Sequence, residues 1–137
     1  MGWFTKLLGL ETEPHEVVHV TDETFKKEVL DSPLPVLVDV WSQGCGPCKM
    51  LEPVVMQLSR DFKGRLKVVE FDVEAAPKTA ARLRVTGTPT VVYFRKGREV
   101  ERVVGYRAGH YHRELIEQEL LPAAQRAPDA PATAPKA

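Results

Sequence analysis

Residues 36–48 read VLVDVWSQGCGPC, and this stretch decides the fold. Its first six residues, 36–41, are nearly all apolar, which predicts a central β-strand that is covered on both faces. A helix is expected to follow from about Cys45 to Phe62, because apolar residues recur along it with helical spacing. A buried strand that turns directly into a helix is typical of an α/β protein.

The rest of the chain continues the alternation of strands and helices. Further β-like segments are expected at 16–20, 66–73, 90–94 and 98–104, the last two forming an antiparallel hairpin. Further helices are expected from a cap at Thr21 or Asp22 to about Leu30, from Pro77 to about Arg84, and over 108–121. In the last helix, Tyr111, Leu115, Ile116 and Leu120 are predicted to point inward. The pattern predicts an α/β fold with a central mixed sheet and helices on both faces.

The length of 137 residues and a hydrophobic content of 43% predict one globular domain, over residues 14–121. Residues 1–13 carry apolar side chains with helical spacing and are expected to form an amphipathic leader. The leader is expected to rest on the domain or to fray, with docking to a partner or a membrane surface as the alternative. Residues 122–137 are rich in proline and alanine and are predicted to be a disordered tail.

Charge and hydropathy argue against several classes of partner. The 19 basic residues balance the 19 acidic ones, so no overall field favours nucleic acid or an anionic membrane. No apolar run is long enough to cross a bilayer, and the N-terminal segment lacks the features of a secretory signal. We therefore expect a cytoplasmic protein without an integral membrane segment, and a monomer.

The two cysteines point to redox chemistry. Cys45 falls at the N-terminus of the predicted helix, where free backbone N–H groups and the helix dipole stabilise a thiolate, so it is the expected nucleophile. Cys48 lies one helical turn further on, where burial keeps its pKa high, and it is the expected resolving thiol. Pro47 is suited to the first turn of a helix because its missing N–H needs no partner there.

Two structural roles for the cysteines are the alternatives. A zinc site needs about four ligands, and the only other candidates are His15, His19, His110 and His112, whose spacing fits no known zinc finger. A purely structural disulfide would close so small a ring that it would add little stability. We therefore favour redox chemistry and expect no metal.

Several blocks of the sequence resemble the thioredoxin family over residues 16–121. They are Val38 to Trp41, Cys45 to Lys49, Gly87 to Thr90, and Gly105, in the order and spacing of that family. The resemblance implies the thioredoxin fold and a thiol-disulfide oxidoreductase that reduces disulfide-containing protein substrates. It also implies a thioredoxin-reductase-type electron donor, and no bound cofactor is expected because the chain has no GxGxxG motif for a nicotinamide or flavin.

The resemblance also assigns a substrate-binding surface. It implies a cis peptide bond between Thr88 and Pro89, which leaves the Thr88 backbone free to bind an extended substrate. Gly105 would leave room for that substrate. The alternative is that this glycine only forms a turn at the end of a strand. The rest of the surface is expected at Trp41, which packs beside the cysteines, and at Gly46 and Pro47 between them.

Asp39 is a charged residue inside an apolar strand. Burial is expected to raise its pKa and suit it to accept a proton from Cys48, which is also the role that the family assigns to it. The alternative is a solvent-exposed strand position.

Two residues depart from the family pattern. Gly44 stands where thioredoxins usually have Trp, so an apolar contact is lost and the range of substrates is expected to differ. Glu70 stands where many members have a Lys that pairs with the buried Asp, so Asp39 is expected to face a second acid.

Two other functions remain open at this point. A disulfide oxidase or isomerase would need a more oxidising cysteine pair. A redox-sensitive protein-binding module would use the same groove without turnover.

Overall fold

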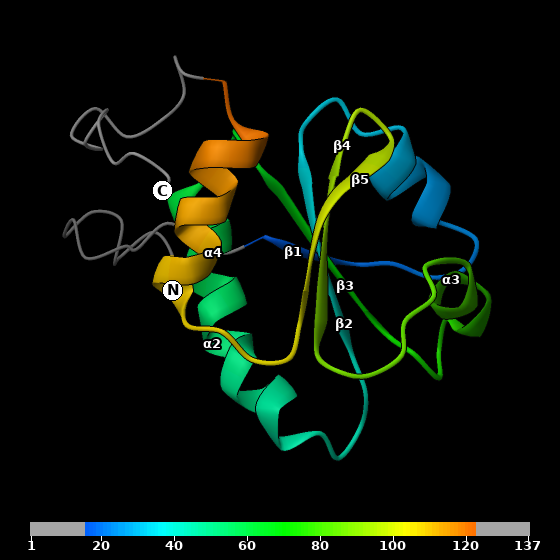
Figure 1. Cartoon of the computed structure of the whole chain (residues 1–137). Helices are drawn as coiled ribbons and strands as arrows, with labels where there is room; N and C mark the ends of the chain where they lie inside the picture. The colour runs from blue at the N-terminus through cyan, green and yellow to red at the C-terminus, as the bar shows by residue number, and fades with distance from the viewer. Residues whose placement is uncertain (1–15, 123–137) are drawn as a thin grey trace, which may run out of the picture.

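The computed structural model describes residues 16–122, which form a five-stranded mixed sheet between two layers of helices (Figure 1). The strands are β1 (Val17–His19), β2 (Val36–Trp41), β3 (Lys67–Asp72), β4 (Thr90–Arg95) and β5 (Arg98–Val104), in the spatial order β1-β3-β2-β4-β5. β1, β3 and β2 are parallel, whereas β4 and β5 pair antiparallel. The predicted mixed sheet and the hairpin are both confirmed.

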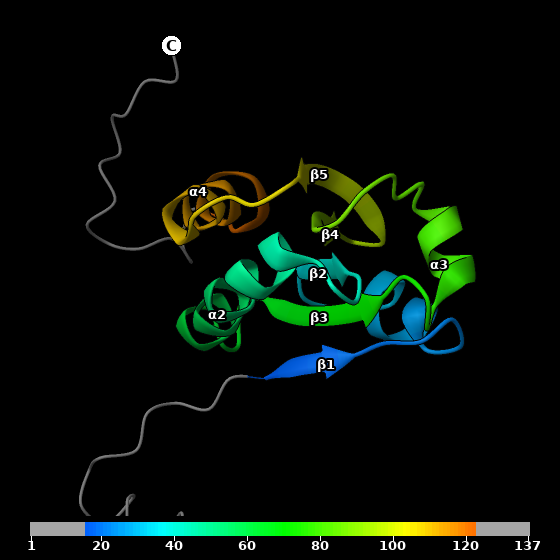
Figure 2. The same cartoon turned by 90° about the horizontal axis from the view of Figure 1, so that it is seen from below.

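Helices cover both faces of the sheet. α2 (Gly46–Asp61) and α4 (Gly109–Leu115) lie on one face, and η1 (Lys26–Leu30) and α3 (Pro77–Arg82) lie on the other (Figure 2). η1 and η2 (Ile116–Leu120), which continues α4, have π-helical hydrogen bonding. Because side chains of a strand alternate between faces, the apolar β2 contributes to both halves of the core. This explains the nearly continuous apolar run of that strand.

α2 begins after the turn that follows the C-terminal end of the central strand β2. Cys45 is its N-cap, with an extended backbone, and Pro47 lies in the first turn. The predicted apolar stripe packs against the sheet through the buried residues Leu51, Val55, Leu58 and Phe62, while Val54 is partly buried. The helix continues through Pro53 and ends at Asp61, close to the predicted end.

The first predicted helix begins later than expected, because η1 has Phe25 as its N-cap and no side-chain capping hydrogen bond. Thr21 Oγ1 accepts a hydrogen bond from the backbone N–H of Thr24, at 3.2 Å, in the turn that leads into η1. Asp22 caps a different helix, because its carboxylate accepts the backbone N–H of Thr79 in α3 at 2.7 Å. A contact across 57 positions of the chain could not be inferred from local spacing.

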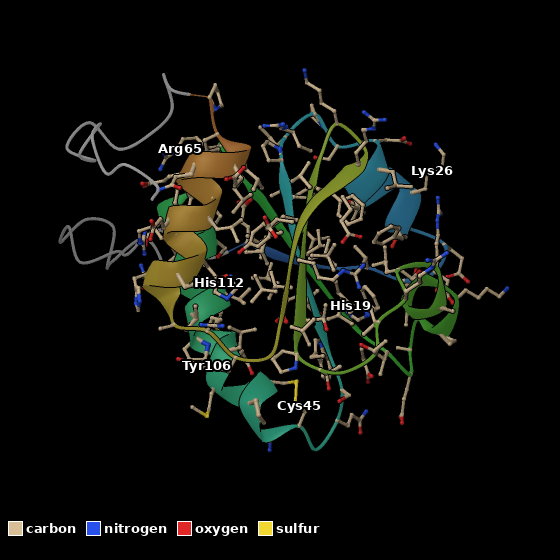
Figure 3. The ribbon with its side chains drawn as sticks, in the orientation of Figure 1. His19, Lys26, Cys45, Arg65, Tyr106 and His112 are labelled. Carbon is tan, nitrogen blue, oxygen red and sulfur yellow. A yellow bond between two sulfur atoms is a disulfide. The ribbon has the colours of Figure 1, made fainter. Side chains whose placement is uncertain are left out.

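One prediction about the last helix is wrong. Tyr111 is 40% exposed, and the guanidinium of Arg107 lies over its ring. His112 points inward instead and is 1% exposed, with Nδ1 2.6 Å from the hydroxyl of Tyr93 in β4 (Figure 3). His112, Ile116 and Leu120 share one face at a spacing of four residues. Only Tyr111 is therefore wrong, because Ile116 and Leu120 are buried as predicted and Leu115 is partly buried against the same core.

The predicted leader, residues 1–13, lies outside the described residues, and so does the predicted tail beyond residue 122. Within residues 16–122, no helix is long and apolar enough to cross a membrane.

Candidate active site

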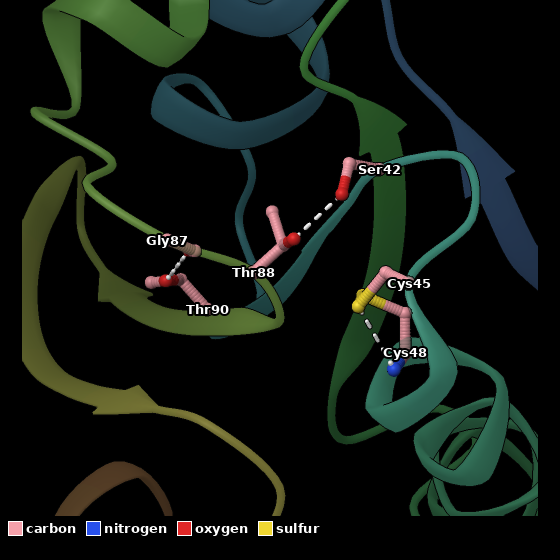
Figure 4. The surroundings of a disulfide bond; sticks show 6 residues. All are labelled: Ser42, Cys45, Cys48, Gly87, Thr88 and Thr90. Atoms are coloured by element: carbon pink, nitrogen blue, oxygen red, sulfur yellow. Dashed lines mark hydrogen bonds between the residues drawn. A yellow bond between two sulfur atoms is a disulfide. The ribbon is translucent and has the colours of Figure 1, made fainter.

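The two cysteines are joined in a disulfide at the turn between β2 and α2 (Figure 4). Cys45 is partly exposed and Cys48 is buried, with 5.3 Å between their Cα atoms. The Sγ of Cys45 accepts a hydrogen bond from the backbone N–H of Cys48 at 3.2 Å. This N–H is one of the free donors at a helix N-terminus, and it would stabilise a thiolate on Cys45 in the reduced protein.

Asp39 lies in the middle of β2 and is buried, at 7% exposure, so the solvent-exposed alternative is wrong. Its Oδ1 has no hydrogen-bond partner. Burial, followed by the nearby charges of Glu70 and Glu52, raises the pKa of Asp39 to about 7. A carboxyl group with this pKa can exchange a proton near neutral pH.

A cavity of about 670 Å³ connects the cysteine pair with Asp39. Both cysteines, Asp39, Trp41 and Glu70 are among its lining residues. The buried carboxyl and the two cysteines therefore line one and the same cavity. No group of three or more His, Cys, Asp or Glu residues that could hold a metal ion occurs in the part of the chain that the structure describes.

The segment before β4 lies beside the disulfide and has the expected cis bond between Thr88 and Pro89 (Figure 4). The Thr88 hydroxyl lies 2.6 Å from the hydroxyl of Ser42, which holds this segment against the end of β2. The N–H of Gly105 donates to the carbonyl of Pro89 at 2.8 Å. Gly105 has a φ of +90°, which favours glycine, and a Cβ there would meet no atom within 4 Å.

Known proteins with similar sequences identify the family of this chain. The family model for thioredoxin covers residues 16–118. The chain belongs to the thioredoxin family. It is 45% identical over 86 residues to Thioredoxin 1 of Nostoc sp., across 63% of this chain and 80% of the relative. It is 41% identical over 87 residues to a thioredoxin of Rickettsia felis, across 64% and 83%. With a thioredoxin of Rickettsia bellii the identity is 37% over 99 residues, across 72% and 91%.

The fold and the function inferred from the resemblance are therefore confirmed. The chain has the thioredoxin fold and is a thiol-disulfide oxidoreductase, a protein-disulfide reductase with a redox-active cysteine pair.

Glu70 places a second acid beside Asp39, as expected from the sequence. It is the direct neighbour of Asp39 in the pairing of β2 with β3. Trp41 Nε1 donates a hydrogen bond to Glu70 Oε2, and His19 Nδ1 lies 2.8 Å from Oε1. The contact with His19 was not foreseen, because His19 is 51 positions from Glu70 and only the pairing of β1 with β3 joins them.

Gly44 has a φ of +74°, in the left-handed region that favours glycine. A Cβ at this position would meet no atom within 4 Å, so the turn before Cys45 is open. A Trp in this backbone conformation would be strained. The backbone of this turn therefore favours Gly44. Because glycine has no side chain, this position offers no apolar contact beside Cys45.

Ser42 is the other active-site contact that sequence reasoning missed. It lies three positions before Cys45, in a turn whose length gave no reason to single it out. Its partner Thr88 is 46 positions away. Only the packing of two loops at the same end of the sheet brings the two hydroxyls together.

Proposed function

We propose that Cys45 is the nucleophile of this reductase, Cys48 its resolving thiol and Asp39 the proton acceptor. The observation that carries the assignment is the arrangement at the start of α2. Cys45 is the partly exposed N-cap, and its Sγ accepts a hydrogen bond from the backbone N–H of Cys48. Cys48 is buried and lines the cavity that Asp39 also lines. The exposed sulfur is available to a substrate, and the buried one is available only to Cys45.

In the first step, the thiolate of Cys45 attacks one sulfur of a substrate disulfide. A bond forms between Cys45 and that sulfur, and the other substrate sulfur leaves as a thiolate, which takes a proton from water. In the second step, Asp39 accepts the proton of Cys48, and the Cys48 thiolate attacks the Sγ of Cys45. The second substrate thiolate leaves and is protonated, so the substrate gains two electrons and the enzyme becomes a disulfide.

The substrate is held, in this proposal, along the surface beside the cysteine pair. Trp41 offers an apolar contact on one side, and the cis bond of Thr88 and Pro89 lies on the other. Gly105 leaves space at the end of β5. Gly46 and Pro47 lie at the exposed start of α2, between the cysteines. An extended chain with a disulfide could approach Cys45 between these elements.

Renewed turnover requires an electron donor that restores the dithiol. A reductase partner of the thioredoxin-reductase type fits this need.

We propose a cytoplasmic location, because the cysteine pair must be kept reduced and thiols are kept reduced in the cytoplasm. We propose a monomeric state, because a single chain supplies every residue assigned above.

Insulin reduction with a chemical dithiol as donor tests the assignment of the cysteines. The wild-type protein should accelerate precipitation of the insulin B chain, and Cys45→Ser should abolish the acceleration. Cys48→Ser should accumulate a mixed disulfide with substrate on Cys45, visible as a mass increase that reductant removes. Trapping by Cys45→Ser instead would reverse the assigned roles of the two thiols.

Two further results would favour the other functions. Partner binding that persists in the Cys45→Ser, Cys48→Ser double variant, together with no insulin turnover by the wild type, would indicate a binding module. A reduction potential of the cysteine pair well above that of the glutathione pool, measured by thiol trapping, would indicate an oxidase or isomerase.

A further inference from the structure

Three titratable residues form a row across neighbouring strands on one face of the sheet. His19 in β1 pairs with Glu70 in β3, and Glu70 pairs with Asp39 in β2. Directly opposed residues of adjacent strands point to the same face. Side-chain exposure is 53% for His19 and 22% for Glu70, while Asp39 is buried. The row therefore leads from the solvent-exposed edge of the sheet to the carboxyl group beside the cysteine pair.

Glu70 is held in a defined orientation within this row. One of its oxygens accepts the indole N–H of Trp41, and the other lies 2.8 Å from Nδ1 of His19. An ionised carboxylate only accepts hydrogen bonds, so Nδ1 of His19 is the donor. Oδ1 of Asp39, by contrast, has no partner. Glu70 therefore acts on Asp39 through its charge, across the cavity that both residues line.

Other charged or titratable groups face Asp39 from the neighbouring elements. α2 contributes Glu52 and Lys49 to the same cavity. The buried Tyr93 of β4 is not part of the cavity lining but is close enough to feel the charge of Asp39, and its own pKa is raised well above its usual value mainly by burial. Glu52 and Lys49 are both exposed, so solvent screens them. After burial itself, the carboxylate of Glu70 is the strongest influence on the pKa of Asp39, ahead of Glu52.

We propose that Glu70 is a further positioning residue of the reaction, whose carboxylate, held by Trp41 and His19, governs how readily Asp39 takes up the proton of Cys48. The inference rests on the proposed role of Asp39 as proton acceptor. An ionised Glu70 opposes a second negative charge on its neighbour, so Asp39 keeps its proton to higher pH. Once ionised, Asp39 is then a stronger base toward the Cys48 thiol.

The first test measures Asp39 directly in the oxidised protein, where the cysteines do not titrate. The ¹³C carboxyl signal of Asp39 is followed against pH by NMR in the wild type, in Glu70→Gln and in Glu74→Gln. Glu74→Gln is the matched control, because it removes the same charge from an exposed residue outside the cavity. The wild-type midpoint should lie near pH 7. Glu70→Gln should lower it by about one pH unit, and Glu74→Gln should leave it unchanged.

The second test measures resolution by Cys48. The reduced protein is mixed rapidly with excess dithiobis(nitrobenzoic acid), which releases one coloured thiolate when Cys45 attacks and another when Cys48 resolves. The rate of the second release should rise with pH through the Asp39 midpoint, and Glu70→Gln should move that rise to lower pH by the same amount. Glu70→Lys, which reverses the charge, should move it further in the same direction. His19→Phe should give a smaller shift than Glu70→Gln, because Glu70 keeps its charge but loses one partner.

An unchanged NMR midpoint of Asp39 in Glu70→Gln, with near-UV circular dichroism showing native packing, would overturn the proposal. The same shift in Glu74→Gln would also overturn it, because the effect would then be one of net charge. Failure of the role assigned to Asp39 gives a different result: Asp39→Asn would resolve at the wild-type rate at every pH, while the NMR midpoints of Asp39 would still respond to Glu70.

Discussion

Replacement of Asp39 by Asn should stabilise the oxidised protein at alkaline pH and have much less effect in acid. The buried carboxyl has a pKa of about 7 in the folded protein, against an ordinary value of 3.8. Between these two values the unfolded chain releases the proton while the folded protein keeps it. Because the folded-state pKa is raised, the free energy of unfolding falls as the pH rises through this window. Asn has a similar shape and no charge, so the variant does not lose this stability.

The expected size follows from the two pKa values. Each pH unit of difference corresponds to about 1.4 kcal/mol, so the step from 3.8 to about 7 amounts to about 4 kcal/mol. The stability difference between Asp39→Asn and wild type should therefore grow by about 4 kcal/mol between pH 4 and pH 8 and level off above pH 8.

Urea denaturation of both oxidised proteins at a series of pH values measures this difference. All other groups are common to the two proteins and cancel in the comparison. The m-value should stay the same, so that the change appears in the midpoint alone. A stability difference that stays constant within about 1 kcal/mol from pH 4 to pH 8 would refute the reasoning that Asp39 is buried as a neutral acid.

Two further predictions concern residues outside the reaction. Burial lowers the pKa of His112 to about 4, from 6.5, so its contribution to stability is complete above pH 6.5 and is lost as the pH falls toward 4. His112→Phe should remove about 3 kcal/mol of pH dependence over that window, measured by urea denaturation, and an unaltered acid profile would contradict the assignment. Gly44→Ala should lower the free energy of unfolding by about 1 kcal/mol because of the positive φ. Gly46→Ala, which needs no positive φ, is its control, and equal losses in both would argue against strain at Gly44.

Local patterns were sufficient for much of the fold and for the reactive pair. The apolar run of 36–41 predicted the buried central strand, and Cys45 at the start of the following helix predicted a reactive thiol. Asp39 could be identified because a charge within that run has no solvent to face. These signals are periodicity, capping and burial, which depend on residues close together in the chain.

Contacts between distant segments escaped the same reasoning. In the last helix, Tyr111 was predicted to point inward and His112 was overlooked, because the partner of His112, Tyr93, lies in another element. Asp22 was considered only for the neighbouring helix, although it caps α3.

The sequence by itself determined the alternation of strands and helices, the position of the cysteine pair at a helix N-terminus and the presence of an acid within the central strand. Only the tertiary structure decided which groups surround that acid. Strand order and register bring Glu70 beside Asp39 and His19 beside Glu70. The packing of two loops places Ser42 against Thr88. Electrostatic and hydrogen-bonding interactions depend on distances of a few ångströms, and the pairing of segments far apart in the chain sets those distances.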